Sequence, residues 1–216
     1  MKTALIFDLD GTLLDTLQDL ADGVNHVLQS RGCPLRTLEE IRSFVGNGAE
    51  KLMRLALPEH YPELAQALGE FRAFYGANCQ VKTAPYAGIL EALQELKEKY
   101  PLAIVSNKPH FAVQSLCADY FPGIPAWGEA EGCPRKPAPD MVRRAMDALG
   151  AESCIYIGDS EVDVLTAKNA GVPCLSVTWG FRDRDTLTQA GAVHFCDAPE
   201  MLPGAIEKLL GETYGQ

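Results

Sequence analysis

Four short runs of mostly apolar residues recur along the chain, at residues 4–9, 102–107, 154–159 and 174–179. Each run favours β-structure and lacks polar alternation, which is typical of strands covered on both faces of a parallel sheet. Apolar stripes at helical spacing separate the runs, formed by Ile89, Leu90, Leu93 and Leu96 and by Met141, Val142, Ala145, Met146 and Leu149. This alternation of strand and helix predicts an α/β fold with a doubly wound parallel sheet.

One stretch interrupts the alternation, because residues from about 16 to 80 contain no strand signal. Apolar residues at helical spacing predict an amphipathic helix between Leu17 and Leu28. Thr37 and Glu40 have the spacing of a capping box at the start of a second helix. Two more helical segments are predicted, at residues 49–57 and 63–77.

This helical stretch divides the chain into two predicted units. Residues 15–82 are expected to form an all-helical domain inserted into an α/β core of residues 1–14 and 83–216. The segment TAPYAG at 83–88 is expected to lead the chain back into the sheet. At 216 residues, the chain is long enough to bury a sizeable core in this arrangement.

Composition and charge narrow the classes of function. The hydrophobic content of 47% argues against disorder, and the formal net charge of -10 argues against nucleic acid or an anionic membrane as the main partner. No apolar run approaches the roughly 20 residues that span a bilayer, and Asp8 and Asp10 interrupt the apolar segment of any signal peptide. The seven cysteines form no C-x-x-C pair, so we expect free thiols and a reducing cytoplasm. No long exposed apolar stripe indicates an oligomer, and the oligomeric state stays open.

Polar residues follow the predicted strands, in the order Asp8 and Asp10, Ser106 and Asn107, Lys136 in a proline-rich loop, and Asp159 and Asp163. In open α/β sheets, ligands bind beyond the carboxyl ends of the strands, so we expect these residues to line one crevice. Carboxylates gathered in one crevice repel one another, and a divalent cation resolves that conflict. Because one or two carboxylates and a substrate phosphate are typical ligands of Mg²⁺, the sequence predicts Mg²⁺ as a cofactor.

The first two acids fit phosphoryl transfer. An aspartate is ionised at neutral pH, so Asp8 can attack phosphorus without a base and divide the hydrolysis into two steps through an aspartyl-phosphate. Asp10 lies two residues further along the chain and can give a proton to the leaving group and later take one from water. Gly11 permits a sharp turn close to the phosphate, while Ser106 and Lys136 can stabilise the phosphoryl charge.

Four motifs, each at the end of a predicted strand, resemble those of the haloacid dehalogenase superfamily. They are DLDGT at 8–12, Ser106, Lys136 within RKPAPD, and GDSEVD at 158–163. A finer resemblance is to the phosphoglycolate phosphatase-like branch, carried by DGTLLDT, VGNGAEKL, PYAG, SNKP and KPAPD. The resemblance covers essentially the whole chain, because the inserted helices correspond to the helical cap of the family.

The resemblance implies a Rossmann-like core and a Mg²⁺-dependent phosphatase. Its substrate would be a small phosphorylated metabolite, with 2-phosphoglycolate as the first expectation. Asp8 is implied to be the nucleophile and a metal ligand. Asp10 is implied to be the general acid and base, with its backbone carbonyl as a further metal ligand. Lys136 is implied to neutralise charge on the nucleophile and the phosphate.

The remaining site residues are also implied by the resemblance. Asp159 would ligate the metal, and Asp163 would support it through water or through Lys136. The residues implied to hold the phosphoryl group are Ser106, Asn107 through its backbone amide, Gly11 and Thr12.

Several alternatives share these core residues. A sugar-phosphate mutase of the β-phosphoglucomutase type carries a cap arginine for a second phosphate, where this chain offers Ala49. Dehalogenases and Schiff-base phosphonate hydrolases lack an acid at the position of Asp10, so Lys51 is not expected to act as their cap lysine. A pyrophosphatase or nucleotidase would differ only in cap contacts. Outside enzymes, a receiver-like or phosphate-binding module would use similar acids, although receivers are shorter and lack both the DGT and the helical insert.

Three polar residues also have a structural interpretation. Asp163 could complement the start of a helix. We expect Lys108 to be a solvated lysine, with substrate contact as the alternative. The run FRDRD at 181–185 is expected to be a solvated loop, in which Arg182 could meet a substrate or a partner.

Overall fold

The structure is a computed structural model that describes residues 2–214. Its centre is a sheet of six strands in the order β5–β4–β1–β6–β7–β8. These strands are β1 (Thr3–Phe7), β4 (Leu102–Pro109), β5 (Ala126–Glu129), β6 (Ser153–Gly158), β7 (Cys174–Val177) and β8 (His194–Cys196). All neighbouring strands pair in parallel, which confirms the predicted doubly wound α/β fold.

The central strand β1 shows why the strands have continuous apolar sequences. Its side chains alternate between two buried clusters, with Leu5 and Phe7 in one and Ala4 and Ile6 in the other. The elements that flank the sheet are α5 (Ile89–Lys97), α6 (His110–Tyr120), α7 (Asp140–Leu149), α8 (Glu161–Ala170), α9 (Arg184–Gln189), η1 (Pro199–Met201) and α10 (Leu202–Tyr214). Burial of each large apolar side chain stabilises the fold by roughly 1.5–3 kcal/mol, so both faces of the sheet must be covered.

The two edge strands have no counterpart among the predicted apolar runs. β5 has the sequence AWGE and β8 the sequence HFC, and both are only partly buried. An edge strand pairs on one side only, and natural edge strands are short. The apolar signal of β5 and β8 is therefore too short and too mixed to predict them.

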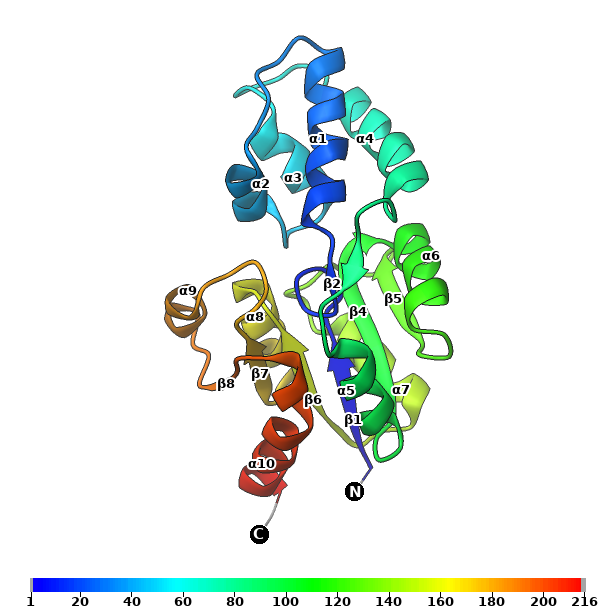
Figure 1. The fold of residues 1–216 in the computed structure, drawn as a ribbon, viewed down its shortest axis with the longest axis vertical. Coiled ribbons are helices and arrows are strands. Elements are labelled where there is room, and N and C mark those ends of the chain that lie inside the picture. Colours follow the sequence, from blue (N-terminus) through cyan, green and yellow to red (C-terminus); the bar gives the residue numbers. More distant parts are fainter. Residues whose placement is uncertain (1, 215–216) are drawn as a thin grey trace.

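Four helices form a separate layer beyond the carboxyl edge of the sheet, drawn in blue to cyan at the top of Figure 1. They are α1 (Leu17–Ser30), α2 (Leu38–Phe44), α3 (Ala49–Ala56) and α4 (Leu64–Asn78). The predicted capping box opens α2, because the Thr37 hydroxyl accepts from the Glu40 N–H and the Glu40 carboxylate accepts from the Thr37 N–H. No helix within residues 2–214 combines the length and the apolar character needed to cross a bilayer.

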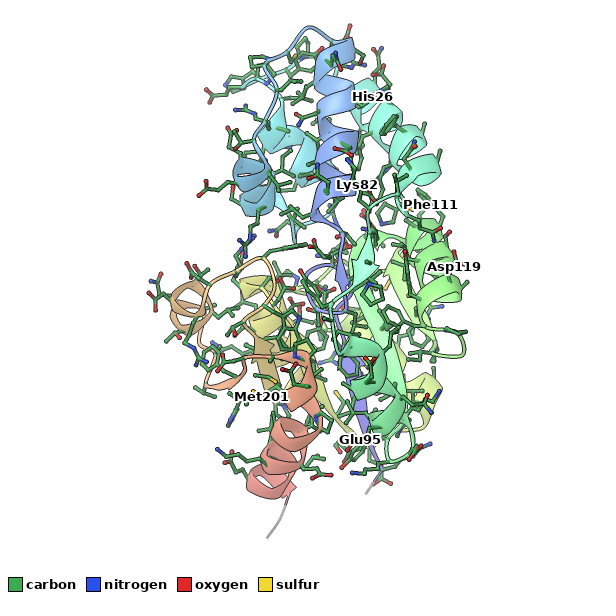
Figure 2. The ribbon with its side chains drawn as sticks, viewed as in Figure 1. His26, Lys82, Glu95, Phe111, Asp119 and Met201 are labelled. Carbon is green, nitrogen blue, oxygen red and sulfur yellow. The ribbon has the colours of Figure 1, made fainter. Side chains whose placement is uncertain are left out.

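The chain enters and leaves this layer through two adjacent segments. β2 (Leu14–Asp15) and β3 (Ala84–Pro85) pair with each other in antiparallel fashion, apart from the main sheet. Residues 83–88, which the sequence predicts to lead the chain back into the sheet, form β3 and the turn before α5, and the chain rejoins the main sheet at β4. Asp19 of α1 fastens this junction by accepting the backbone N–H groups of Lys82 and Thr83 at 2.8–3.0 Å. Figure 2 shows Lys82 at this junction and His26 farther out in the helical layer.

Candidate active site

A cavity lies between the carboxyl edge of the sheet and the helical layer. The core contributes Asp8 and Asp10 after β1, Ser106–Lys108 at the end of β4, Lys136 from the loop before α7, and Asp159 after β6. These strands are neighbours in the sheet although they are far apart in the sequence. The fold therefore brings together the motif residues that the sequence places at strand ends. The predicted site residues Gly11, Thr12 and Asp163 do not line the cavity themselves but contact residues that do, with Thr12 bonded to Asp159 and Asp163 bonded to Lys136.

Lys136 is held between two carboxylates. Its Nζ lies 2.8 Å from Asp8 Oδ1 and 2.8 Å from Asp163 Oδ1. It also donates to the Tyr156 hydroxyl, which in turn donates to Asp163 Oδ1, each at 3.0 Å. Burial opposes the charge of Lys136, but the negative charges of Asp163 and Asp8 outweigh it and raise the pKa of the amine above its ordinary value. Lys136 is therefore a fixed cation beside Asp8.

Asp163 uses its two oxygens for different purposes. Oδ2 accepts from the backbone N–H of Ser160 at 3.0 Å and from the Ser160 hydroxyl at 2.6 Å, completing a capping box at the start of α8. Oδ1 faces Lys136. The structural interpretation of Asp163 is thus confirmed, and the same contacts fix the direction of the oxygen that pairs with the lysine.

Three carboxylates crowd together at the centre of the site. Asp8, Asp159 and Asp163 can each place an oxygen within 4.8 Å of the other two, and they are only 7%, 1% and 0% exposed. Burial, together with the charge of Asp163, raises the pKa of Asp8 well above its usual range and that of Asp159 to about 7. Among the described residues, Asp8 Oδ1 receives no well-aligned hydrogen bond despite its ion pair with Lys136. Buried, mutually repelling carboxylate oxygens clustered in this way fit a small divalent cation such as Mg²⁺.

The carboxylate of Asp159 is oriented by its surroundings. Oδ1 accepts from the Thr12 hydroxyl at 3.0 Å, and Oδ2 accepts from the Phe181 N–H at 2.7 Å. Gly11 has a φ of +84°, and a Cβ at this position would overlap the Asp159 carboxylate. Only glycine therefore allows the turn after β1 to approach Asp159 so closely. The Thr12 hydroxyl is engaged with Asp159, and its role as a phosphate ligand stays a prediction.

Asp10 lies apart from the three clustered acids and pairs with Lys108. Lys108 Nζ lies 2.7 Å from Asp10 Oδ1. Lys108 is only 5% exposed, so the expectation of a solvated lysine is wrong. Burial again opposes the charge, but Asp10 and Tyr75 together outweigh it and raise the pKa of Lys108 above its ordinary value. The cavity thus holds a second buried cation, Lys108, next to Asp10.

Ser106 and Asn107 arrange the end of β4. The Ser106 hydroxyl accepts from the Lys108 N–H at 3.2 Å. The Asn107 side chain accepts from the Lys136 N–H at 2.8 Å and donates to the Lys136 carbonyl at 2.9 Å. Its amide nitrogen also donates to the Gly46 carbonyl of the helical layer at 3.0 Å. Asn107 therefore positions the loop of Lys136 and contacts the opposite wall of the cavity.

Arg182 does not lie in a solvated loop as expected. Its guanidinium pairs with Glu161 at 2.8 Å and donates to the carbonyls of Arg42 at 2.8 Å and Val45 at 2.7 Å. Arg42 of α2 returns a hydrogen bond to the Phe181 carbonyl at 3.0 Å. Phe181 is also the residue whose N–H holds Asp159. These reciprocal contacts join the helical layer to the loop after β7.

Two buried tyrosines of the site, Tyr75 and Tyr156, and the exposed Arg42 beside it were not predicted from the sequence. Tyr156 lies within an apolar run, where its hydroxyl gave no sign of contacting Lys136. Tyr75 lies within α4 on what reads as an apolar stripe, yet it lines the cavity. Nothing in the spacing of these residues signals their partners, which come from distant elements.

Comparison with known proteins places the chain among phosphatases. The sequence profile "Haloacid dehalogenase-like hydrolase" matches residues 5–177. A phosphoglycolate phosphatase of Rhodobacter capsulatus is 38% identical over 96% of this chain and 98% of the relative. A phosphoglycolate phosphatase of Xanthomonas campestris pv. campestris is 32% identical over 92% of this chain and 94% of the relative.

Solved structures agree with these sequence relatives. A candidate phosphoglycolate phosphatase from Lactobacillus delbrueckii subsp. bulgaricus superposes with a TM-score of 0.89 and 38% identity, covering 95% of this chain and 99% of that chain. With the profile match, the relatives and the four motifs around one cavity all in agreement, the chain belongs to the haloacid dehalogenase-like hydrolase family.

Proposed function

We propose that the protein is a Mg²⁺-dependent phosphatase that hydrolyses 2-phosphoglycolate or a closely similar small monoester. The observation that carries the proposal is Asp8, a buried carboxylate paired with Lys136 that shares one cavity with Asp10. The names of the relatives from Rhodobacter capsulatus and Xanthomonas campestris supply the first candidate substrate.

The arrangement supports a two-step reaction. An oxygen of Asp8 bonds to phosphorus as the bond from phosphorus to the ester oxygen breaks, and Asp10 gives a proton to that oxygen. A water then attacks the aspartyl-phosphate, Asp10 takes its proton, and phosphate leaves as the Asp8 carboxylate is restored. Lys136 offsets charge on Asp8 and on the phosphoryl oxygens throughout.

The phosphoryl group would be held by groups at the ends of β1 and β4. The Ser106 hydroxyl and the backbone N–H of Asn107 are the proposed donors at the end of β4. Gly11 and Thr12 are the proposed contribution of the turn after β1, with the Thr12 hydroxyl orienting Asp159. The Ser106 hydroxyl oxygen is already held by the Lys108 N–H, so little reorganisation is needed at the end of β4.

Asp8, Asp159 and the backbone carbonyl of Asp10 would hold the metal, with Asp163 supporting it through water or through Lys136. When bound, Mg²⁺ supplies positive charge that offsets the phosphoryl oxygens and the clustered carboxylates. The buried oxygens of the three acids within 4.8 Å of one another support this choice.

We further propose that residues 15–82 act as a cap over a core formed by residues 1–14 and 83–216. The paired segments β2 and β3 would serve as the hinge at which this cap opens for substrate and product. We also propose a cytoplasmic location, because all seven cysteines are free thiols, as is usual in reducing compartments.

Phosphatase activity is favoured over a mutase by the wall that faces the acids. Ala49 lines the cavity at the start of α3. Its methyl group offers no charge to a second phosphate, which a bisphosphate intermediate would require. A pyrophosphatase or nucleotidase would need room for a larger leaving group, and no specific contact in the cavity favours either.

Steady-state hydrolysis of 2-phosphoglycolate with Mg²⁺, followed by release of inorganic phosphate, tests the proposal. Asp8→Asn removes the nucleophile while keeping its shape, and kcat should fall at least about a thousandfold. Asp22→Asn is the matched control, because Asp22 is an exposed partner of Lys82 on α1. Full Mg²⁺-dependent turnover by Asp8→Asn would refute the nucleophile, and absence of phosphate release by the unmodified enzyme would refute the function.

A further inference from the structure

Two polar groups in the cavity take no part in the proposed phosphoryl transfer. Lys108 reaches in from the end of β4, and Tyr75 reaches in from α4 of the helical layer. Lys108 Nζ lies 4.8 Å from the centroid of the Tyr75 ring and 2.7 Å from Asp10 Oδ1. The lysine and the tyrosine are therefore neighbours at the Asp10 end of the cavity.

The Tyr75 hydroxyl lies close to the Lys108 ammonium, which can only donate, so the hydroxyl hydrogen has no acceptor among the described residues although Tyr75 is only 2% exposed. Its ring is fixed by stacking on Phe71, with ring centroids 5.4 Å apart. Buried polar groups in folded proteins nearly always have partners, and an unpaired one destabilises the fold. A fixed, unpaired donor that faces a binding cavity indicates a ligand that accepts from it.

The surroundings leave few other groups for such a ligand. The helical layer otherwise presents mainly apolar side chains to the cavity, from Leu20, Val45, Ala49, Leu52 and Phe71. Arg182 also lines the cavity, but its guanidinium is already paired with Glu161 and with backbone carbonyls. The cavity measures about 50 Å³, room for roughly four waters. In this conformation the site accepts only a small molecule.

We propose that Lys108 and the Tyr75 hydroxyl bind a carboxylate on the leaving group, so that the enzyme selects short phosphomonoesters bearing a carboxylate next to the ester carbon. This inference rests on the proposed function and specifies its substrate class. The ammonium of Lys108 supplies the charge, and the hydroxyl of Tyr75 supplies a directed hydrogen bond to one carboxylate oxygen.

The position of Asp10 explains why the carboxylate must be close to the phosphate. As the proton donor, Asp10 must contact the ester oxygen of the leaving group. In carboxymethyl phosphate, which is 2-phosphoglycolate, a single carbon separates that ester oxygen from the carboxylate. Lys108 contacts Asp10 directly, so its ammonium is within reach of a carboxylate placed one carbon from the ester oxygen. A longer acid would extend into the apolar wall.

The test compares 2-phosphoglycolate with its amide, carbamoylmethyl phosphate, which has the same shape without the negative charge. The measured quantity is the ratio of kcat/KM for the acid to kcat/KM for the amide. In Tyr75→Phe this ratio should fall roughly 10- to 100-fold, since a hydrogen bond to a charged group is lost. Most of the change should appear in KM for the acid. In Lys108→Met the ratio should fall at least as far.

Stability measurements and control variants separate this role from a structural one. Tyr75→Phe keeps the ring stacked on Phe71 and removes an unpaired hydroxyl, so its midpoint of urea unfolding should not decrease. Tyr120→Phe is the matched control, because the Tyr120 hydroxyl donates to the Thr83 carbonyl outside the cavity. Lys82→Met controls for the loss of a lysine, because Lys82 pairs with Asp22 outside the cavity. Neither control should change the ratio.

The outcomes distinguish this inference from the proposed function. If the unmodified enzyme releases no phosphate from either ester, the proposed function fails. If it hydrolyses both esters with similar kcat/KM, the phosphatase stands and carboxylate recognition is overturned. An unchanged ratio in Tyr75→Phe overturns the assignment of Tyr75, and an unchanged ratio in Lys108→Met overturns that of Lys108.

Discussion

The crowding of carboxylates at the site makes the stability of the metal-free protein depend on pH in an unusual direction. Burial and the charge of Asp163 raise the pKa of Asp159 from its ordinary value of 3.8 to about 7 in the folded protein. The folded state therefore binds a proton at Asp159 more tightly than the unfolded chain does. Below about pH 4 this contribution to stability is fully present, and it is lost as pH rises through about 7.

The size of the effect follows from the shift. The difference between about 7 and 3.8 is roughly three pKa units, and each unit corresponds to about 1.4 kcal/mol. Asp159 alone should thus lower the free energy of unfolding by up to about 4 kcal/mol between pH 4 and pH 8. Asp159 is almost fully buried, so solvent does not screen this effect. Asp8 changes in the same direction, because its pKa is raised for the same reasons.

Urea unfolding at several pH values, in the presence of a chelator, measures this effect. Asp159→Asn carries no charge at this position, so the difference between the unmodified protein and Asp159→Asn isolates the titration. As pH rises from 5 to 8, the free energy of unfolding of the unmodified protein should fall relative to that of Asp159→Asn. Saturating Mg²⁺ should largely remove the trend, because the cation stabilises the ionised carboxylates. A difference that stays flat across this pH range in the chelator would refute the reasoning.

Two further substitutions test other contacts of the site. Lys136→Met leaves the carboxylates of Asp8 and Asp163 without their buried cation, so in chelator the free energy of unfolding should fall by about 3–5 kcal/mol. Turnover should fall at least about a hundredfold. Arg143→Met, at an exposed position, is the control, and normal stability of Lys136→Met would contradict the assignment of Lys136. Arg182→Met removes the donors that join the helical layer to the loop after β7, so amide exchange at residues 42–46 should accelerate and KM should rise. Arg184→Met is its control, because Arg184 pairs with exposed Asp197. Equal amide exchange in both variants would contradict the inference that Arg182 joins the helical layer to the loop after β7.

Much of the fold and the main site were predictable from sequence, because their signals are local. The central strands are buried on both faces, so each appears as an apolar run, and each acid follows its run directly. The topology of parallel sheets then requires strand ends to share one edge, which is why Asp8, Lys136 and Asp159 could be placed in one site. The helices of the inserted layer were likewise evident from their apolar spacing and from the capping box at Thr37.

Other features depend on which surfaces meet in three dimensions, and no local pattern encodes them. Lys108 has the sequence context of a solvated lysine, and only the packing of α4 over the end of β4 buries it beside Asp10 and under Tyr75. The Tyr156 hydroxyl becomes part of the site only because β6 lies next to β1 in the sheet. Sequence by itself determined which chemical groups lie at the strand ends, because secondary structure and strand polarity are set by near neighbours. Tertiary structure decided which of them are buried and paired, because burial and electrostatic partnership are properties of surfaces brought together from distant parts of the chain.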